Sequence, residues 1–211
     1  MMPSAPPIPL LPGRFYHLYN HAVGDENLFR ERENYFYFLR QYSKYISPVA
    51  DTFAYELMPN HFHFFIRIKS EDELLNYFLS LQDPESPKEA KIDFAKFTMQ
   101  QFSNFMNGYA KAYNKKYKRK GALVIDFVKR KEITSSKYFV NLINYIHWNV
   151  VLHGFCDHPE DWEFSSIHAF LKRGKTKLKI EEVLKWFGGK GKFIAITKEG
   201  KIFLPSEIDF V

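Results

Sequence analysis

Several stretches of the chain show the alternation of hydrophobic and polar residues, or the enrichment in aromatic and β-branched residues, that is typical of β-strands. Strands are predicted for Arg14–Val23, Asp51–Met58, His61–Ile68 and Ala122–Ile133. Only Pro59-Asn60 separates the second strand from the third, and this dipeptide is suited to a tight turn. These two strands are therefore expected to form a hairpin.

Other stretches repeat their hydrophobic residues at helical spacing. Three long helices are predicted over residues 31–48, Phe94–Lys116 and residues 135–153. Thr134 or Ser135 is the expected N-cap of the third helix, and Gly154 is the glycine expected just beyond its end. The polar, proline-containing segment at residues 81–91 is expected to be a loop.

The predicted order of elements is β-α-β-β-α-β-α, followed by a tail. This order predicts an α+β fold, namely a ferredoxin-like antiparallel sheet with helices packed on one face. We expect a flexible proline-rich leader over residues 1–13 and a main domain over residues 14–170. Residues 171–211 are expected to form a small C-terminal appendage, with a short helix at Ile180–Trp186 and a β-hairpin at Lys192–Leu204.

Composition narrows the class of protein. A chain of 211 residues with 45% hydrophobic residues is long enough to bury a full core. Its single cysteine, Cys156, cannot form an internal disulfide, which favours a reducing, cytoplasmic compartment. No apolar run approaches the roughly 20 residues that a membrane span requires, so no membrane partner is expected.

Positive charge is concentrated in one segment. The chain carries a net charge of +6, whereas residues 111–131 alone hold nine Lys or Arg residues and one acid, Asp126. Aromatic residues are interleaved with these cations, which is the pattern of a nucleic-acid-binding surface; a solvated helix end and loop is the alternative. The candidate DNA contacts are Lys111, Lys115, Lys116, Tyr117, Lys118, Arg119, Lys120, Lys129, Arg130 and Lys131.

Two histidines in the predicted third strand form a candidate metal site. Because side chains alternate along a strand, His61 and His63 share one face, while Phe62 and Phe64 point to the other. Two neutral imidazoles can bind one divalent cation, and the absence of a cysteine cluster favours an open, catalytic site over a closed structural one. The alternative is that both histidines are structural.

The third predicted helix supplies two further candidates. Its core stripe is expected to be Phe139, Leu142, Ile143, Ile146 and Val150. Tyr145 and Asn149 are four residues apart on an adjacent face, so both side chains project the same way. An amide oxygen suits a hard cation such as Mg²⁺ or Mn²⁺, and a phenol beside that cation is a candidate nucleophile toward phosphorus. Alternatively, Tyr145 packs at the edge of the core.

Six blocks of the sequence resemble, in the same order, those of the REP-associated tyrosine transposases, which are single-tyrosine members of the HUH nuclease superfamily (U denotes a bulky hydrophobic residue). The blocks are "YHLYNHAV", "ENYFYFLRQY", "ELMPNHFHFFIRI", "QQFSNFMNGYAKAYNKKYKRKGALV", "YFVNLINYIHWNVVLHGF" and "DWEFSSIHAF". The resemblance covers residues 14–170 and implies the HUH nuclease fold, in a bacterial protein associated with the nucleoid.

The resemblance also assigns roles to particular residues. His61 and His63 match the metal-binding HUH histidines, Tyr145 matches the nucleophile, and Asn149 matches the polar residue that completes the metal site. It implies that the protein cleaves and rejoins single-stranded DNA near hairpins, with Mg²⁺ or Mn²⁺. Tyr145 would form a 5′-phosphotyrosine and release a 3′-hydroxyl. The protein would act as a monomer or a homodimer.

One position departs from the family pattern. Relatives usually carry Asn-Pro-Val where this chain has Asn149-Val150-Val151. Valine lets the helix continue to about His153, which changes the angle at which Tyr145 approaches its target. Tyr138, two turns before Tyr145, is the rival nucleophile. Trp148 is expected to pack under the C-terminal appendage, with an exposed stacking role as its alternative.

Two other functions remain as alternatives. One is a protein of the same fold that binds DNA hairpins without cleaving them. The other is a metal hydrolase acting on small molecules, which would need an acid near the histidines. Glu56 is the best-placed acid, but it lies an odd number of residues from both histidines, so we expect it on the opposite face of the sheet unless a bulge intervenes.

Overall fold

The computed structural model describes residues 8–83, 92–125, 128–172 and 174–200. Its centre is a four-stranded antiparallel sheet with the strand order β2-β3-β1-β4. Helices α1 and α3 connect the strands in the split β-α-β manner of ferredoxin-like folds, which confirms the predicted α+β class. The strands and connecting helices are β1 (Phe15–His21), α1 (Arg32–Tyr45), β2 (Ala50–Leu57), β3 (His61–Ile68), α3 (Phe94–Lys116) and β4 (Lys129–Glu132).

Six further short elements and helices complete the described fold. They are α2 (Glu71–Ser80), α4 (Lys137–Leu152), η1 (Pro159–Asp161), α5 (Ile167–Leu171), α6 (Ile180–Phe187) and α7 (Lys190–Glu199). None of the helices in the described part of the chain is long and apolar enough to cross a membrane.

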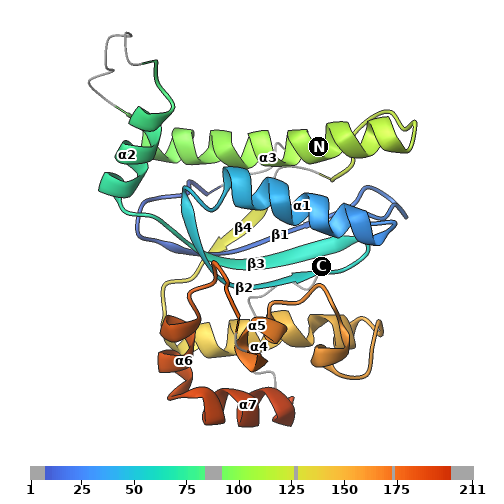
Figure 1. Ribbon diagram of the computed structural model, residues 1–211, viewed down its shortest axis with the longest axis vertical. Helices are drawn as coiled ribbons and strands as arrows, with labels where there is room; N and C mark the ends of the chain where they lie inside the picture. Colours follow the sequence, from blue (N-terminus) through green and yellow to red (C-terminus); the bar gives the residue numbers. More distant parts are fainter. Residues whose placement is uncertain (1–7, 84–91, 126–127, 173, 201–211) are drawn as a thin grey trace, which may run out of the picture.

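Helices cover both faces of the sheet, whereas the sequence predicted one covered face. Figure 1 shows α1 and α3 on one side and α4 to α7 on the other. Along β3, Phe62 and Phe64 belong to the core under α1 and α3, and Phe65 belongs to the core under α4. A strand with aromatic residues on both faces needs a hydrophobic layer on each side. The prediction that helices pack on one face is therefore correct for α1 and α3, which connect strands, and wrong for α4 to α7.

Two predicted boundaries need correction, and one helix was not predicted. The fourth strand is limited to Lys129–Glu132, and the segment before it contributes an isolated pairing of Val124 with Ala22; residues 126–127 lie outside the described part. Helix α2 was missed, although Ser70 and Glu73 form a capping box that marks its start. Helix α4 begins after Ser136 instead of Thr134 or Ser135. Most of the predicted loop at 81–91 lies outside the described residues.

The predicted C-terminal hairpin is wrong over residues 192–199, which belong to α7; residues 201–204 lie outside the described part. Its β-branched residues suggested strands, but the segment forms a helix whose buried residues recur at helical spacing. Phe193 and Thr197 are four residues apart and both buried, and the Phe193 ring lies 4.9 Å from that of Phe170 and 4.8 Å from that of Phe187. Tertiary packing therefore overrides local strand propensity.

The appendage shares a core with the main domain instead of forming a separate unit. Side chains of α6 and α7 pack in one hydrophobic cluster with α4 and with Phe53 and Phe65 of the sheet. The indole N–H of Trp148 donates to the Thr197 carbonyl over 2.8 Å, and a side chain at Gly200 would approach the Trp148 ring within 2.8 Å. The prediction that Trp148 packs under the C-terminal segment is confirmed.

The described part of the N-terminal leader is fixed against the sheet. Leu10 is buried, and the Leu11 N–H donates to the Tyr16 hydroxyl, which in turn donates to the Pro9 carbonyl, each over 2.9 Å. The Gly13 N–H donates to the Ile68 carbonyl over 3.0 Å. The prediction of a flexible leader is thus wrong for residues 8–13, and residues 1–7 lie outside the described part.

Candidate active site

The His-x-His pair lies on the face of the sheet that α4 covers. Both histidines are 1% exposed, and on the opposite face Phe62 and Phe64 belong to the core under α1 and α3. The strand parity read from the sequence is therefore correct. It places both imidazoles in a buried layer between β3 and α4.

Helix α4 brings the other two predicted residues to the histidines. The Asn149 Oδ1 lies 3.1 Å from His61 Nε2, and the Tyr145 ring centroid lies 5.7 Å from that of His63. Val150 does not interrupt the helix, which runs to Leu152 and is followed by Gly154 with a φ of 72°. The structure thus joins all four residues at one site.

Hydrogen bonds on the far side of each imidazole set its orientation. The His61 Nδ1 lies 2.8 Å from the Asn60 Oδ1, and its Nε2 lies 3.1 Å from the Asn149 Oδ1. A neutral imidazole carries one N–H; in the tautomer in which Nδ1–H donates to Asn60, the Nε2 lone pair is available to a cation. The His63 Nδ1 lies 2.9 Å from the His17 Nε2, and the buried His63 Nε2 has no hydrogen-bond partner among the described residues. Such outer contacts orient metal-binding histidines.

These donor atoms fit a divalent cation. The His61 Nε2 and the amide oxygen of Asn149 lie 3.1 Å apart, close enough to bind one cation together, and the unpartnered His63 Nε2 is buried in the same layer. Within the described residues, no three His, Cys, Asp or Glu side chains are arranged to hold a metal, so the candidate ligand set depends on the Asn149 amide. Two nitrogens and one oxygen leave positions open for substrate.

Burial keeps the imidazoles in the form that binds metal. Desolvation lowers the pKa of His61 to about 4 and that of His17 to about 3, and it holds the pKa of His63 well below its ordinary value. Burial also raises the pKa of Tyr145, against the effect of a hydrogen bond with Asn149. At neutral pH the free protein therefore has neutral imidazoles and a protonated phenol.

Sequence reasoning missed three histidines near the site. Strand β1 carries His17, Tyr19 and His21 on the same face, and its register places His21 opposite His61 and Tyr19 opposite His63. The His21 and His153 rings lie 5.5 Å and 4.7 Å from that of His61. The alternation in "HLYNH" was visible in the sequence, but the pairing of β1 with β3 was not.

The prediction for Glu56 was wrong. Glu56 lies directly opposite His63 in the β2–β3 pairing, and residues directly opposite each other share a face. Separation along the chain does not fix the relative facing of two strands, because the turn sets their register. Glu56 is fully buried, and its carboxyl oxygens have no hydrogen-bond partner of normal geometry among the described residues.

Burial raises the pKa of Glu56 well above its ordinary value, and the nearby Ser165 hydroxyl only partly opposes this. The folded state therefore holds a proton that the unfolded state releases above about pH 4.5, so this group makes the protein less stable as pH rises. We expect Glu56→Gln to gain stability relative to wild type between pH 5 and 8, by at most about 1.4 kcal/mol per pH unit. Urea unfolding across this range measures the difference; a pH-independent difference would contradict it.

The basic segment divides into exposed and engaged side chains. Lys116 and Arg119 pair with Glu31 and Glu26, and the Tyr117 hydroxyl bonds to Glu31. Arg130 bonds to the Ile8 carbonyl. The exposed candidates outside these contacts are Lys111, Lys115, Lys118, Lys120 and Lys129, and Lys131 is half-buried. All ten assignments to DNA stay predictions, but Tyr117 is held against α1 and is poorly placed to stack on a base.

One row of side chains links the basic segment to the site. Strand pairing aligns Glu56, His63, Tyr19 and Lys129 across β2, β3, β1 and β4. All four lie on the face that α4 covers, with neighbouring strands about 4.8 Å apart. Lys129 is therefore the exposed cation that the sheet register places in line with His63.

The fold is similar to a solved structure. That structure is a REP-associated tyrosine transposase bound to a REP hairpin, with a TM-score of 0.56, 15% sequence identity, and coverage of 81% of this chain and 87% of the other. At this identity the similarity shows the fold. No protein-family model matches the sequence, and no curated protein matches it.

Proposed function

We propose that this protein is a metal-dependent transposase or endonuclease that cleaves and rejoins single-stranded DNA at hairpins through a covalent bond to Tyr145. The observation that carries the proposal is the convergence of Tyr145 and Asn149 from α4 on His61 and His63 from β3. The shared fold with a transposase bound to a DNA hairpin supports the same class of substrate.

In the proposed reaction the Tyr145 oxygen attacks the scissile phosphorus. The bond from phosphorus to the 3′-oxygen breaks, a 5′-phosphotyrosine forms, and the phenolic proton is lost to solvent while the released 3′-oxygen takes up a proton. Attack by a 3′-hydroxyl on the phosphotyrosine reverses these steps and rejoins the strand. The bond energy is retained in the phosphotyrosine, so no external energy source is needed.

His61, His63 and Asn149 would hold the Mg²⁺ or Mn²⁺ ion of this reaction. When bound, the cation polarises the phosphate and stabilises the charge that develops on it. Asn60 and His17 keep the two imidazoles oriented through their hydrogen bonds at 2.8 Å and 2.9 Å. Because burial keeps both imidazoles neutral, no proton competes with the metal at neutral pH.

The exposed lysines supply the contact with the DNA backbone. Lys129 is in line with His63, and Lys118 and Lys120 are exposed in the loop that precedes β4. We expect Lys129→Ala to weaken hairpin binding for all sequences alike and to reduce the slope of log affinity against log salt by about 0.7 to 0.9. Fluorescence anisotropy between 50 and 200 mM salt tests this; an unchanged slope would remove Lys129 from the interface.

A second candidate function is hairpin binding without cleavage. The observation in its favour is the burial of Tyr145, which is 1% exposed in the free protein and carries a protonated hydroxyl. Under this alternative the phenol stays packed against the histidines when DNA binds. Val150 in place of the family's proline, which leaves α4 continuous, would contribute to that arrangement.

A covalent-trapping experiment separates the two functions. Labelled single-stranded hairpins from repeats flanking the gene are incubated with the protein and Mg²⁺ or Mn²⁺, then resolved on a denaturing gel. The proposed nuclease gives a label that migrates with the protein and disappears with EDTA. Binding in a parallel gel-shift experiment without any adduct would favour the hairpin-binding protein, and Val150→Pro would then be tested for recovery of the adduct.

A further inference from the structure

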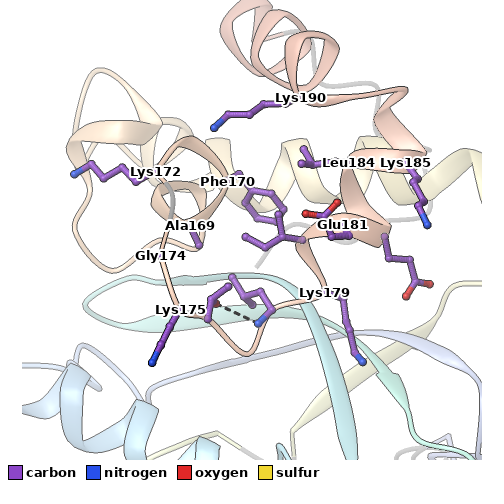
Figure 2. A pocket seen from close by; sticks show the side chains of 14 residues that line it. Ala169, Phe170, Lys172, Gly174, Lys175, Lys179, Glu181, Leu184, Lys185 and Lys190 are labelled. Atoms are coloured by element: carbon purple, nitrogen blue, oxygen red, sulfur yellow. Dashed lines mark hydrogen bonds between the residues drawn. The ribbon is translucent and has the colours of Figure 1, made fainter.

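A cavity of about 1060 Å³ lies among the C-terminal helices, and its lining includes none of the candidate active-site residues. It is formed by the end of α5, the loop before α6, α6 itself and the start of α7, and Figure 2 shows the side chains around it. Its apolar lining includes Phe170, Leu178 and Leu184. Its charged lining includes the exposed residues Lys172, Lys175, Lys179, Lys185 and Lys190.

The acids near this cavity are mostly committed to other partners. Glu182 accepts from Arg67 over 2.8 Å, and Lys179 pairs with Asp51 over 3.1 Å. These four charges balance one another. Lys190 donates to a backbone carbonyl, which leaves its positive charge uncompensated.

Three lysines of the lining remain available to a ligand. Among the residues that the structure describes, Lys172, Lys175 and Lys185 form no ion pair with an acid, and Glu181 is the remaining acid of the lining. With Lys190 included, four lysines of the lining stand against one remaining acid, Glu181, so the lining keeps an excess of positive charge. An exposed, uncompensated cluster of this kind attracts anions, and lysines act as point charges for phosphate groups.

The cavity is linked to the candidate active site through strand β2. Leu178 pairs with Thr52, and the Lys179 N–H donates to the Thr52 carbonyl over 3.0 Å. Glu56, four residues further along β2, lies opposite His63. Four residues of a strand span about 13 Å, a distance covered by about four nucleotides at a stacked spacing of about 3.4 Å.

The cavity also lies on the correct side of the sheet. Figure 1 shows α5 and α6 in the same layer as α4, which carries Tyr145, whereas α3 and its basic end lie in the opposite layer. A DNA strand bound only by α3 would have no phosphate contacts in the layer of Tyr145 near α5 and α6. The lysines around the cavity supply them.

We propose that this cavity binds the backbone of the single-stranded DNA that extends from the hairpin past Tyr145. The apolar lining accommodates a base, and Lys172, Lys175 and Lys185 contact its phosphates. The identity of the ligand rests on the proposed function. The binding event does not require cleavage, so the two are tested separately.

The test compares two triple variants of equal charge change, both in a Tyr145→Phe background that prevents cleavage. The pocket variant carries Lys172→Glu, Lys175→Glu and Lys185→Glu. The control carries Lys44→Glu, Lys96→Glu and Lys198→Glu, which are exposed and absent from the cavity lining. Anisotropy measures the affinity of each for a bare hairpin and for the same hairpin with a ten-nucleotide single-stranded tail.

The pocket variant should bind the tailed hairpin at least about 10-fold more weakly than the control, with a salt slope lower by about 2. Both variants should bind the bare hairpin alike. Equal losses for the tailed hairpin, or no DNA binding by the parent protein, would overturn the proposal. If the pocket variant alone loses affinity for the tailed hairpin and wild-type protein forms no adduct, the cavity proposal stands and cleavage is rejected. If wild-type protein forms the adduct but the pocket and control variants bind the tailed hairpin equally, cleavage stands and the cavity proposal is rejected.

A footprint on the unmodified protein gives an independent readout. Acetylation of surface lysines followed by peptide mapping should show Lys172, Lys175 and Lys185 protected by the tailed hairpin and not by the bare one. Lys44 and Lys96 should react equally in both cases. Equal reactivity of the three cavity lysines with and without the tail would also overturn the proposal.

Discussion

Tyr145→Phe is expected to abolish the covalent adduct with DNA while leaving hairpin binding within about twofold of wild type. The substitution removes only a hydroxyl, so the aromatic ring keeps its contacts with His63 and His17 at centroid distances of 5.7 Å and 6.1 Å. Loss of a nucleophile lowers the rate of its reaction by at least about three orders of magnitude. Adduct yield on a denaturing gel measures the effect.

The matched control is Tyr138→Phe. Tyr138 is 39% exposed and precedes Tyr145 by seven residues on α4, which places it about 10 Å away along the helix axis. We expect this variant to form the adduct at the wild-type level. An adduct that persists in Tyr145→Phe and is lost in Tyr138→Phe would transfer the role of nucleophile to Tyr138.

His63→Ala is expected to remove the stabilisation that Mn²⁺ gives the protein. When a metal binds only the folded state and its concentration is 100 times its Kd, it adds about 2.7 kcal/mol to the free energy of unfolding. Removing one of two imidazole ligands should eliminate most of this gain. The variant should also lose stability without metal, about 1–3 kcal/mol, because the buried His17 Nε2 loses its partner at 2.9 Å.

The control for this prediction is His168→Ala. The His168 ring bonds to the Trp162 carbonyl over 2.8 Å and belongs to α5, outside the candidate ligand set. Its variant should retain the full Mn²⁺-dependent shift in Tm. Loss of the shift in both variants, or its retention in His63→Ala, would contradict the assignment of His63 as a ligand.

The candidate site was predictable where two local periodicities determine it. Alternation along β3 places His61 and His63 on one face, and helical spacing directs Tyr145 and Asn149 the same way. Each inference needs only a few neighbouring residues and the repeat of a regular backbone. The resemblance to a family then specified that the two elements meet, and the structure places them together.

The parts that were not predicted depend on register and on tertiary packing. The place of Glu56 follows from its pairing with His63, and that of His21 from its pairing with His61. The two-residue turn at Pro59-Asn60 fixes the first pairing, which counting residues along the chain overlooked, whereas no local pattern fixes the second. Helix α7 forms where strand propensity suggested a hairpin because Phe193 fills a space between Phe170 and Phe187 that only the folded chain creates.

The most direct test of the account is to identify the residue that becomes linked to DNA. Wild-type protein is incubated with a labelled single-stranded hairpin and Mn²⁺, digested with protease and nuclease, and analysed by peptide mass spectrometry. We predict one modified peptide, from α4, with the nucleotide phosphate on Tyr145. Linkage to another residue, or the absence of any linked peptide from protein that binds the hairpin, would contradict the assignment of Tyr145 as the nucleophile.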